Sequence, residues 1–147
     1  MKNIEAYGLR AAEIFKTGVC CSESIVHTFA EDVDPENAMK YTRMSSGLCG
    51  GMGCAAVCGV VTGGACAIGL YFGRDNIEEA QAVKCSTISK LFVKAFQDEF
   101  RETGCKELKT AVPADYQGNT RAFCAHIVQW GAEKVAEIVI QQKKQTI

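Results

Sequence analysis

Apolar residues recur along much of this chain every three or four positions, with polar residues between them. Such spacing is typical of amphipathic helices. It appears over residues 3–17, over the segment that begins at Cys21, and over about 120–143. A further run ahead of Gly104 repeats every four residues, at Ile88, Phe92, Phe96 and Phe100. The alternation that marks strands is not sustained in this sequence, so the pattern predicts an all-α protein.

Local signals indicate where several of these helices begin. Asp34-Pro35 combines a capping side chain with a proline suited to a first turn, and it opens a third helix. Asp75 with Glu78 three residues later has the form of a capping box ahead of the long phenylalanine-bearing helix. Residues 105–119 lack a helical pattern and are expected to be irregular.

The middle of the chain is unusual, because no charged residue occurs between Arg43 and Arg74. This length could span a bilayer. The same stretch contains nine glycines, however, and an irregular glycine loop in lipid would leave backbone groups unpaired. We therefore expect no membrane insertion, and predict a loop over 46–53 that leads into a buried helix over about 54–72.

These segments together predict one domain over residues 1–147, a bundle of about six helices around a buried Gly/Cys-rich central helix. The formal net charge is −1 and no block of lysine or arginine stands out, which argues against nucleic acid and anionic membrane as partners. A central helix that is apolar on every side must be covered all round, and a symmetric homodimer would do so more easily than a monomer.

Cysteine is the feature of the composition that points to chemistry, with nine residues against two histidines. Residues 1–20 contain charged positions and no apolar stretch of the signal-peptide type, so we expect a cytoplasmic protein with reduced thiols. Clustered cysteines in that setting indicate metal binding or redox chemistry. No C-x-x-C and no C-x-x-C-H occurs, which removes thioredoxin dithiols, zinc knuckles, bacterial ferredoxin runs and c-type haem attachment.

The dispersed cysteines differ in their expected settings. Cys21 begins a predicted helix and so lies at the positive end of the helix dipole. That position favours a thiolate or an anionic group. Cys54 is four residues before Cys58 and would share its helix face. Free cysteines also pack as small core residues, and spacing alone does not decide between the two roles. The cofactor-binding candidates are Cys21, Cys49, Cys54, Cys58, Cys105 and Cys124, whereas Cys66 and Cys85 are expected core thiols and Cys20 is structural or accessory.

Several motifs extend over nearly the whole chain. They are Gly18-Val19-Cys20-Cys21-Ser22, Gly50-Gly51-Met52-Gly53, Cys58-Gly59-Val60-Val61-Thr62-Gly63, Gly104-Cys105 and a late Cys124. On these motifs the chain resembles the C_GCAxxG_C_C family of redox-active proteins, although Val60 stands where alanine is usual. The resemblance implies that the four defining cysteines fall on Cys21, Cys58, Cys105 and Cys124. A similar domain in certain cytochromes carries an iron–sulfur centre, so the resemblance implies redox chemistry at a metal.

Three hypotheses follow. The first is a protein that binds an iron–sulfur cluster, of a type the sequence does not specify, for electron transfer or small-molecule redox chemistry with a redox partner protein or small molecule. Its predicted metal ligands are the four family cysteines, and no catalytic residue is assigned. The second is a metal-free thiol–disulfide oxidoreductase in which Cys58 attacks and Cys105 or Cys124 resolves. The third is a binder or carrier of Zn²⁺ or Cu⁺.

Overall fold

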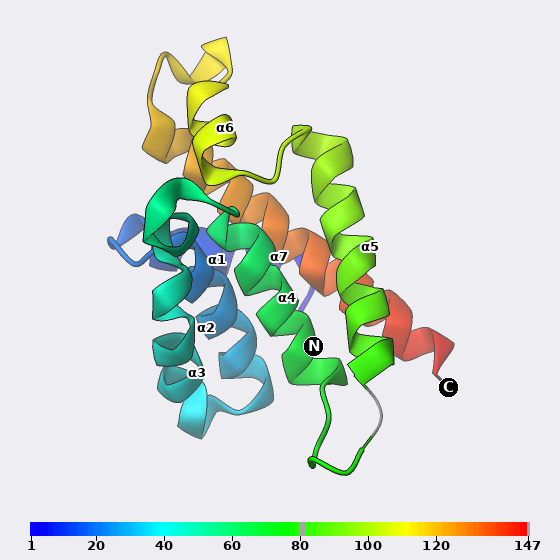
Figure 1. The fold of residues 1–147 in the computed structure, drawn as a ribbon. Coiled ribbons are helices and arrows are strands. Elements are labelled where there is room, and N and C mark those ends of the chain that lie inside the picture. The colour runs from blue at the N-terminus through cyan, green and yellow to red at the C-terminus, as the bar shows by residue number, and fades with distance from the viewer. Residues whose placement is uncertain (80–81, 147) are drawn as a thin grey trace.

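The computed structural model describes residues 1–79 and 82–146. Within these residues the chain forms seven α-helices linked by turns and short helical segments, which confirms the all-α prediction (Figure 1). The helices are α1 (Ile4–Lys16), α2 (Cys21–Val33), α3 (Ala38–Ser45), α4 (Gly59–Phe72), α5 (Ala82–Phe100), α6 (Cys105–Thr110) and α7 (Thr120–Gln145).

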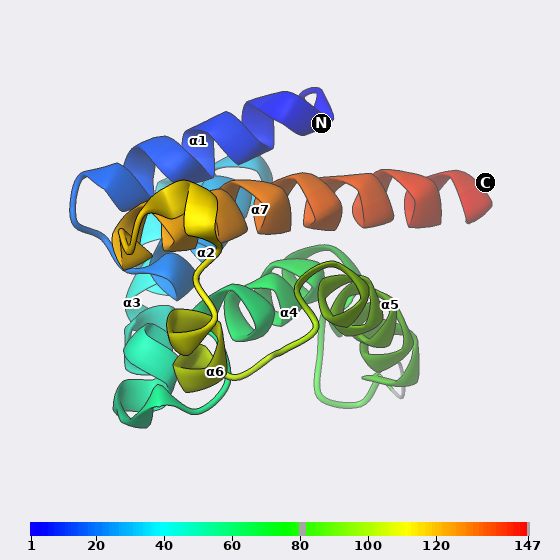
Figure 2. The ribbon, with the colours of Figure 1, turned by 90° about the horizontal axis from the view of Figure 1, so that it is seen from above.

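α2, α5 and α7 pack against α4, and the helices share one core. The first and last helices, α1 and α7, lie side by side and run in opposite directions, with α2 packed against both of them (Figure 2). α4 contacts α2 on one side and α5 and α7 on another. Their apolar faces meet inside, where Phe29, Phe92 and Phe96 are fully buried and Tyr7 stacks on Phe29 at 4.9 Å between ring centroids. The four-residue phenylalanine repeat therefore marks the face of α5 that is directed into the core.

The glycine-rich segment before α4 departs from the predicted helix over 54–72. Gly51, Met52 and Gly53 all have positive φ (62°, 59° and 73°), a conformation that favours glycine and interrupts a helix. Residues 51–55 accordingly form a single wide turn, and Cys58 is the residue that caps α4 at Gly59. Cys54 thus lies outside α4, and the expectation that it shares a helix face with Cys58 is wrong.

Two other boundaries also differ from the sequence prediction. The segment expected to be irregular over 105–119 contains the short helix α6, which begins at Cys105. The backbone N–H of Asp75 is bound by the Glu79 carboxylate at 3.1 Å and not by Glu78, so a local turn replaces the expected capping box.

α4 is buried on most of its surface, but its outer face is open. Cys66 is exposed, so the prediction that it is a core thiol is wrong; Cys85, on α5, is half-buried against the core. None of the helices in the described part of the chain combines the length and the apolar character that a membrane crossing requires.

Candidate four-cysteine site

Four cysteines from four separate helix starts line one cavity of about 340 Å³. Cys21 is the first residue of α2, Cys58 caps α4, Cys105 opens α6, and Cys124 lies in the first turns of α7. No pair of them is closer in sequence than 19 residues, so only the tertiary fold brings them together. Arg121 and Lys109 also line the cavity, together with Phe15, Gly18, Cys20, Gly50, Gly59, Val60, Leu108, Thr120 and Ile127.

Cys58 and Cys105 are held next to each other by a backbone bridge. Val57 and Gly104 pair in an isolated antiparallel bridge. The N–H of Cys58 donates to the Thr103 carbonyl at 2.7 Å, and the N–H of Cys105 donates to the Ala56 carbonyl at 2.6 Å. These bonds fix the backbone at both cysteines, which are buried at 7% and 8% relative exposure. The loop before α4 and the start of α6 therefore form one rigid wall of the cavity.

Cys21 reaches the cavity because α2 and α4 approach closely at glycine positions. A β-carbon at Gly59 would lie 2.4 Å from the Cys21 Sγ, and one at Gly63 would lie 2.9 Å from the Ser22 Cα. Real β-carbon contacts do not occur at such distances, so both positions require glycine while the helices keep this spacing. Glycines four residues apart on one face of α4 therefore let α2 approach its backbone closely.

Cys124 contributes the remaining wall from α7, close to two positive charges. Asn119 caps this helix by accepting a 3.0 Å hydrogen bond from the N–H of Ala122. Arg121 donates a 2.7 Å bond to the Phe15 carbonyl, and its guanidinium lies 4.3 Å from the centroid of the Phe15 ring. These contacts hold a cation at the cavity wall, which favours an anionic occupant.

Burial raises the pKa of three of the four thiols. It raises the pKa of Cys58 to about 12, with the neighbouring Cys21 and Cys105 sulfurs as smaller contributions. Burial also raises the pKa of Cys21 and of Cys124, although Lys109 and Arg121 act in the opposite direction on Cys124. These thiols are therefore protonated near neutral pH, and their thiolate forms need a cation to compensate the negative charge.

The spacing of the four sulfurs bears on the size of the group that they could hold. Within the described residues, no three of these four sulfurs all lie within 4.8 Å of one another. Thiolates bound to one tetrahedral zinc ion at ~2.3 Å would lie only about 3.8 Å apart. The cavity volume also far exceeds the ~30 Å³ of one water molecule. The site fits a group of several atoms better than it fits a single ion.

The other cysteines lie outside this set. Cys49 is bonded to Cys20 in a disulfide, so in this state it has no thiolate to offer a cofactor, which corrects its place among the candidates. Cys54 is exposed, and its sulfur lies 3.5 Å from the Gly51 carbonyl rather than in the cavity wall. The Sγ atoms of Cys20 and Cys49, which are bonded to each other, and a Glu23 carboxylate oxygen lie within 4.8 Å of one another. Sequence spacing gave no sign of this pairing.

The comparisons with known proteins agree with the cysteine pattern. Residues 19–138 match a family model described as "Putative redox-active protein (C_GCAxxG_C_C)". The chain belongs to this family. The match contains all four cysteines of the cavity and the glycines at 59 and 63 that let α4 approach α2. No curated protein and no solved structure matches the chain.

Proposed function

We propose that this member of the family is a redox protein that binds an iron–sulfur cluster through Cys21, Cys58, Cys105 and Cys124. The observation that carries the proposal is the convergence of these four residues, from four helices, on one cavity. Four cysteine thiolates are the usual ligand set of an iron–sulfur cluster. When bound, such a cluster supplies one-electron transfer to a redox partner protein or small molecule.

The surroundings of the cavity support an anionic, electron-accepting group. The N-terminal ends of α2, α4 and α7 face it, and each helix dipole places partial positive charge there. Lys109 and Arg121 add full positive charges. Glycine at position 59 keeps the space beside Cys21 free of a side chain. Together these features stabilise thiolates that burial alone would keep protonated.

The two alternative functions receive less support at this cavity. A thiol–disulfide enzyme with Cys58 as the attacking group needs a thiolate, but a buried thiol with a pKa of about 12 is almost entirely protonated near neutral pH. A carrier that holds zinc, or holds copper with three or more thiolates, needs sulfurs that can close on one ion. In the part of the chain that the structure describes, no three of these four sulfurs lie within 4.8 Å of one another, so they would have to move to do so.

A spectroscopic test addresses the redox function. Protein purified without oxygen should show broad visible absorption that bleaches with dithionite and returns on reoxidation. A protein that is colourless but loaded with zinc would favour the carrier function. A protein that is colourless and metal-free would favour the thiol–disulfide function, and either result would refute the cluster.

We also propose that the protein forms a homodimer, on a different observation. The outer surface of α4 and its neighbours leaves Cys66 and Met44 exposed, the latter at 80%, beside a hollow of about 280 Å³. A second copy would cover this apolar surface. Light scattering on the anaerobic protein should give twice the monomer mass of 15.9 kDa; a monomer mass with the cofactor intact would refute the dimer.

A further inference from the structure

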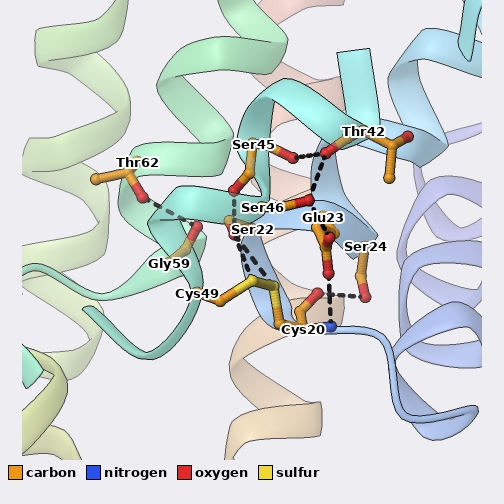
Figure 3. Close-up of a disulfide and its surroundings, with 10 residues drawn as sticks. All are labelled: Cys20, Ser22, Glu23, Ser24, Thr42, Ser45, Ser46, Cys49, Gly59 and Thr62. Atoms are coloured by element: carbon orange, nitrogen blue, oxygen red, sulfur yellow. Dashed lines mark hydrogen bonds between the residues drawn. A yellow bond between two sulfur atoms is a disulfide. The ribbon is translucent and has the colours of Figure 1, made fainter. Parts of the chain in front are cut away.

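The disulfide between Cys20 and Cys49 lies at the edge of the four-cysteine cavity. Cys20 lines the cavity and directly precedes Cys21, while Cys49 precedes Gly50, which lines it as well. The bond links the start of α2 to the segment that follows α3, with Cα atoms 5.7 Å apart (Figure 3). Both cysteines are half-buried, and Ser46, Gly47 and Gly50 around Cys49 are exposed. A reagent in solution can therefore approach the sulfurs from the loop side.

The two segments are already joined by hydrogen bonds that do not involve the sulfur–sulfur bond. Ser22, which is fully buried, donates from its hydroxyl to the Ser45 carbonyl at 3.1 Å. Ser46 donates to one Glu23 carboxylate oxygen at 2.5 Å, and the other oxygen accepts from the Cys20 N–H at 3.3 Å (Figure 3). Because these bonds cross the same junction, the disulfide can open without separating α2 from the segment after α3.

The hydroxyl group of Ser22 lies next to the sulfur–sulfur bond. The Ser22 hydroxyl oxygen lies 3.3 Å from the Cys20 sulfur and 3.8 Å from the Cys49 sulfur. In the oxidised state its proton goes to the Ser45 carbonyl, and a rotation of the hydroxyl would direct it to the sulfur that leaves when the bond breaks. A buried hydrogen bond to a charged sulfur stabilises it more than a bond to a neutral sulfur does.

From this geometry we propose that Cys20 and Cys49 form a second redox centre, a two-electron couple that exchanges with a dithiol reductant. A thiolate of the dithiol attacks the Cys49 sulfur, the Cys20–Cys49 bond breaks, and Cys20 leaves with the electron pair. The second thiol of the reagent then displaces Cys49 and closes the reagent's own disulfide. Two electrons and two protons pass from the dithiol to the pair, which ends as two thiols.

The couple is independent of the metal site, because it uses neither the four cavity cysteines nor any electron from a cluster. The direct test treats anaerobic full-length protein with dithiothreitol in the absence of denaturant. Thiols are then alkylated before and after full reduction with two isotopic labels, and mass spectrometry assigns each label to its cysteine. Cys20 and Cys49 should become reduced together while helical circular dichroism is retained, and oxidised dithiothreitol should restore the bond.

A positioning test uses the two buried serines of α2. Ser22→Ala removes the hydroxyl beside the sulfurs and should slow reduction by dithiothreitol about threefold, as expected when the leaving sulfur loses one hydrogen bond. Ser24→Ala is the matched control, since Ser24 is equally buried but donates to the Cys20 carbonyl at 2.8 Å and not to a sulfur. Equal rates of reduction in the two variants would show that the Ser22 hydroxyl does not assist the thiol–disulfide exchange.

Two outcomes would overturn the proposal as a whole. The pair could stay oxidised in dithiothreitol until denaturant unfolds the chain, which would make the bond a structural link only. The two sulfurs could also remain unpaired in protein exposed to oxidised dithiothreitol. Neither result bears on the iron–sulfur proposal, which is tested by iron, sulfide and the visible spectrum.

Discussion

Gly59 lies against Cys21 so closely that a β-carbon at position 59 would stand 2.4 Å from the Cys21 sulfur. This contact sets both the spacing of α2 and α4 and the position of one proposed ligand. It also allows the ligand site to be disturbed without replacing any cysteine.

We predict that Gly59→Ala displaces Cys21 and reduces the iron bound per chain by at least half. The added methyl group should also lower the free energy of unfolding by roughly 1–3 kcal/mol, the usual cost of overpacking. Gly69→Ala is the matched control, because Gly69 also lies within α4 but has open space where a β-carbon would stand. The control should keep its iron and gain up to about 1 kcal/mol. Equal iron in both variants would contradict the proposed place of Cys21.

A second prediction concerns thermal stability. A metal group held by cysteines from four helices contributes to folding, so losing a ligand should lower the melting temperature as well as the metal content. For Cys21→Ser, Cys105→Ser and Cys124→Ser we expect a loss of at least ~2 kcal/mol, which corresponds to a decrease of roughly 4–8 °C in a domain of this size. Cys66→Ser is the control, since Cys66 is exposed and outside the cavity.

Calorimetry or circular dichroism on anaerobic protein would measure these shifts. A melting temperature in the three variants that equals that of Cys66→Ser would show that the cavity cysteines are not joined through a common group.

The raised pKa of Cys58 predicts how the metal-free protein responds to alkaline pH. Its pKa rises from 9.0 to about 12 on folding, so the folded state keeps a proton that the unfolded state releases. The resulting stability is present below pH 9 and is lost as the pH rises from 9 to about 12, at up to ~1.4 kcal/mol per pH unit. Urea unfolding of metal-free protein at pH 8, 9, 10 and 11 should show this decline.

Cys58→Ser lacks the titrating thiol, so its stability should decline less steeply over the same range. Tyr7, whose pKa burial raises to about 12, is unchanged in both proteins and cancels in the comparison. Parallel declines in the two proteins would mean that Cys58 is not held as a buried neutral thiol.

The helices with regular apolar spacing were predictable, and the loop before α4 was not. The periodic faces of α1, α5 and α7 follow from residues that bury locally, such as Phe92 and Phe96. The positive φ of Met52 was not predictable, because a methionine carries no sign that its backbone will adopt a conformation that favours glycine. The start of α4 at Gly59 therefore differed from the predicted position.

Among the cysteines, too, some positions were predictable from the sequence and others were not. Family motifs identified the four residues that line the cavity, whereas the helix pattern placed Cys66 in the core and Cys54 beside Cys58. The Cys20–Cys49 pair depends on a 5.7 Å approach of two segments that are 29 residues apart, which is a property of the tertiary fold. Sequence spacing contains no information on that distance.

The central claim is most directly tested by iron and acid-labile sulfide per chain in anaerobic wild-type protein and in the Cys58→Ser variant, with Cys66→Ser as control. The account predicts iron and sulfide in equal, at least stoichiometric amounts in the wild type and in the control, and loss of both in Cys58→Ser. Unchanged iron, sulfide and visible bands in Cys58→Ser would contradict it.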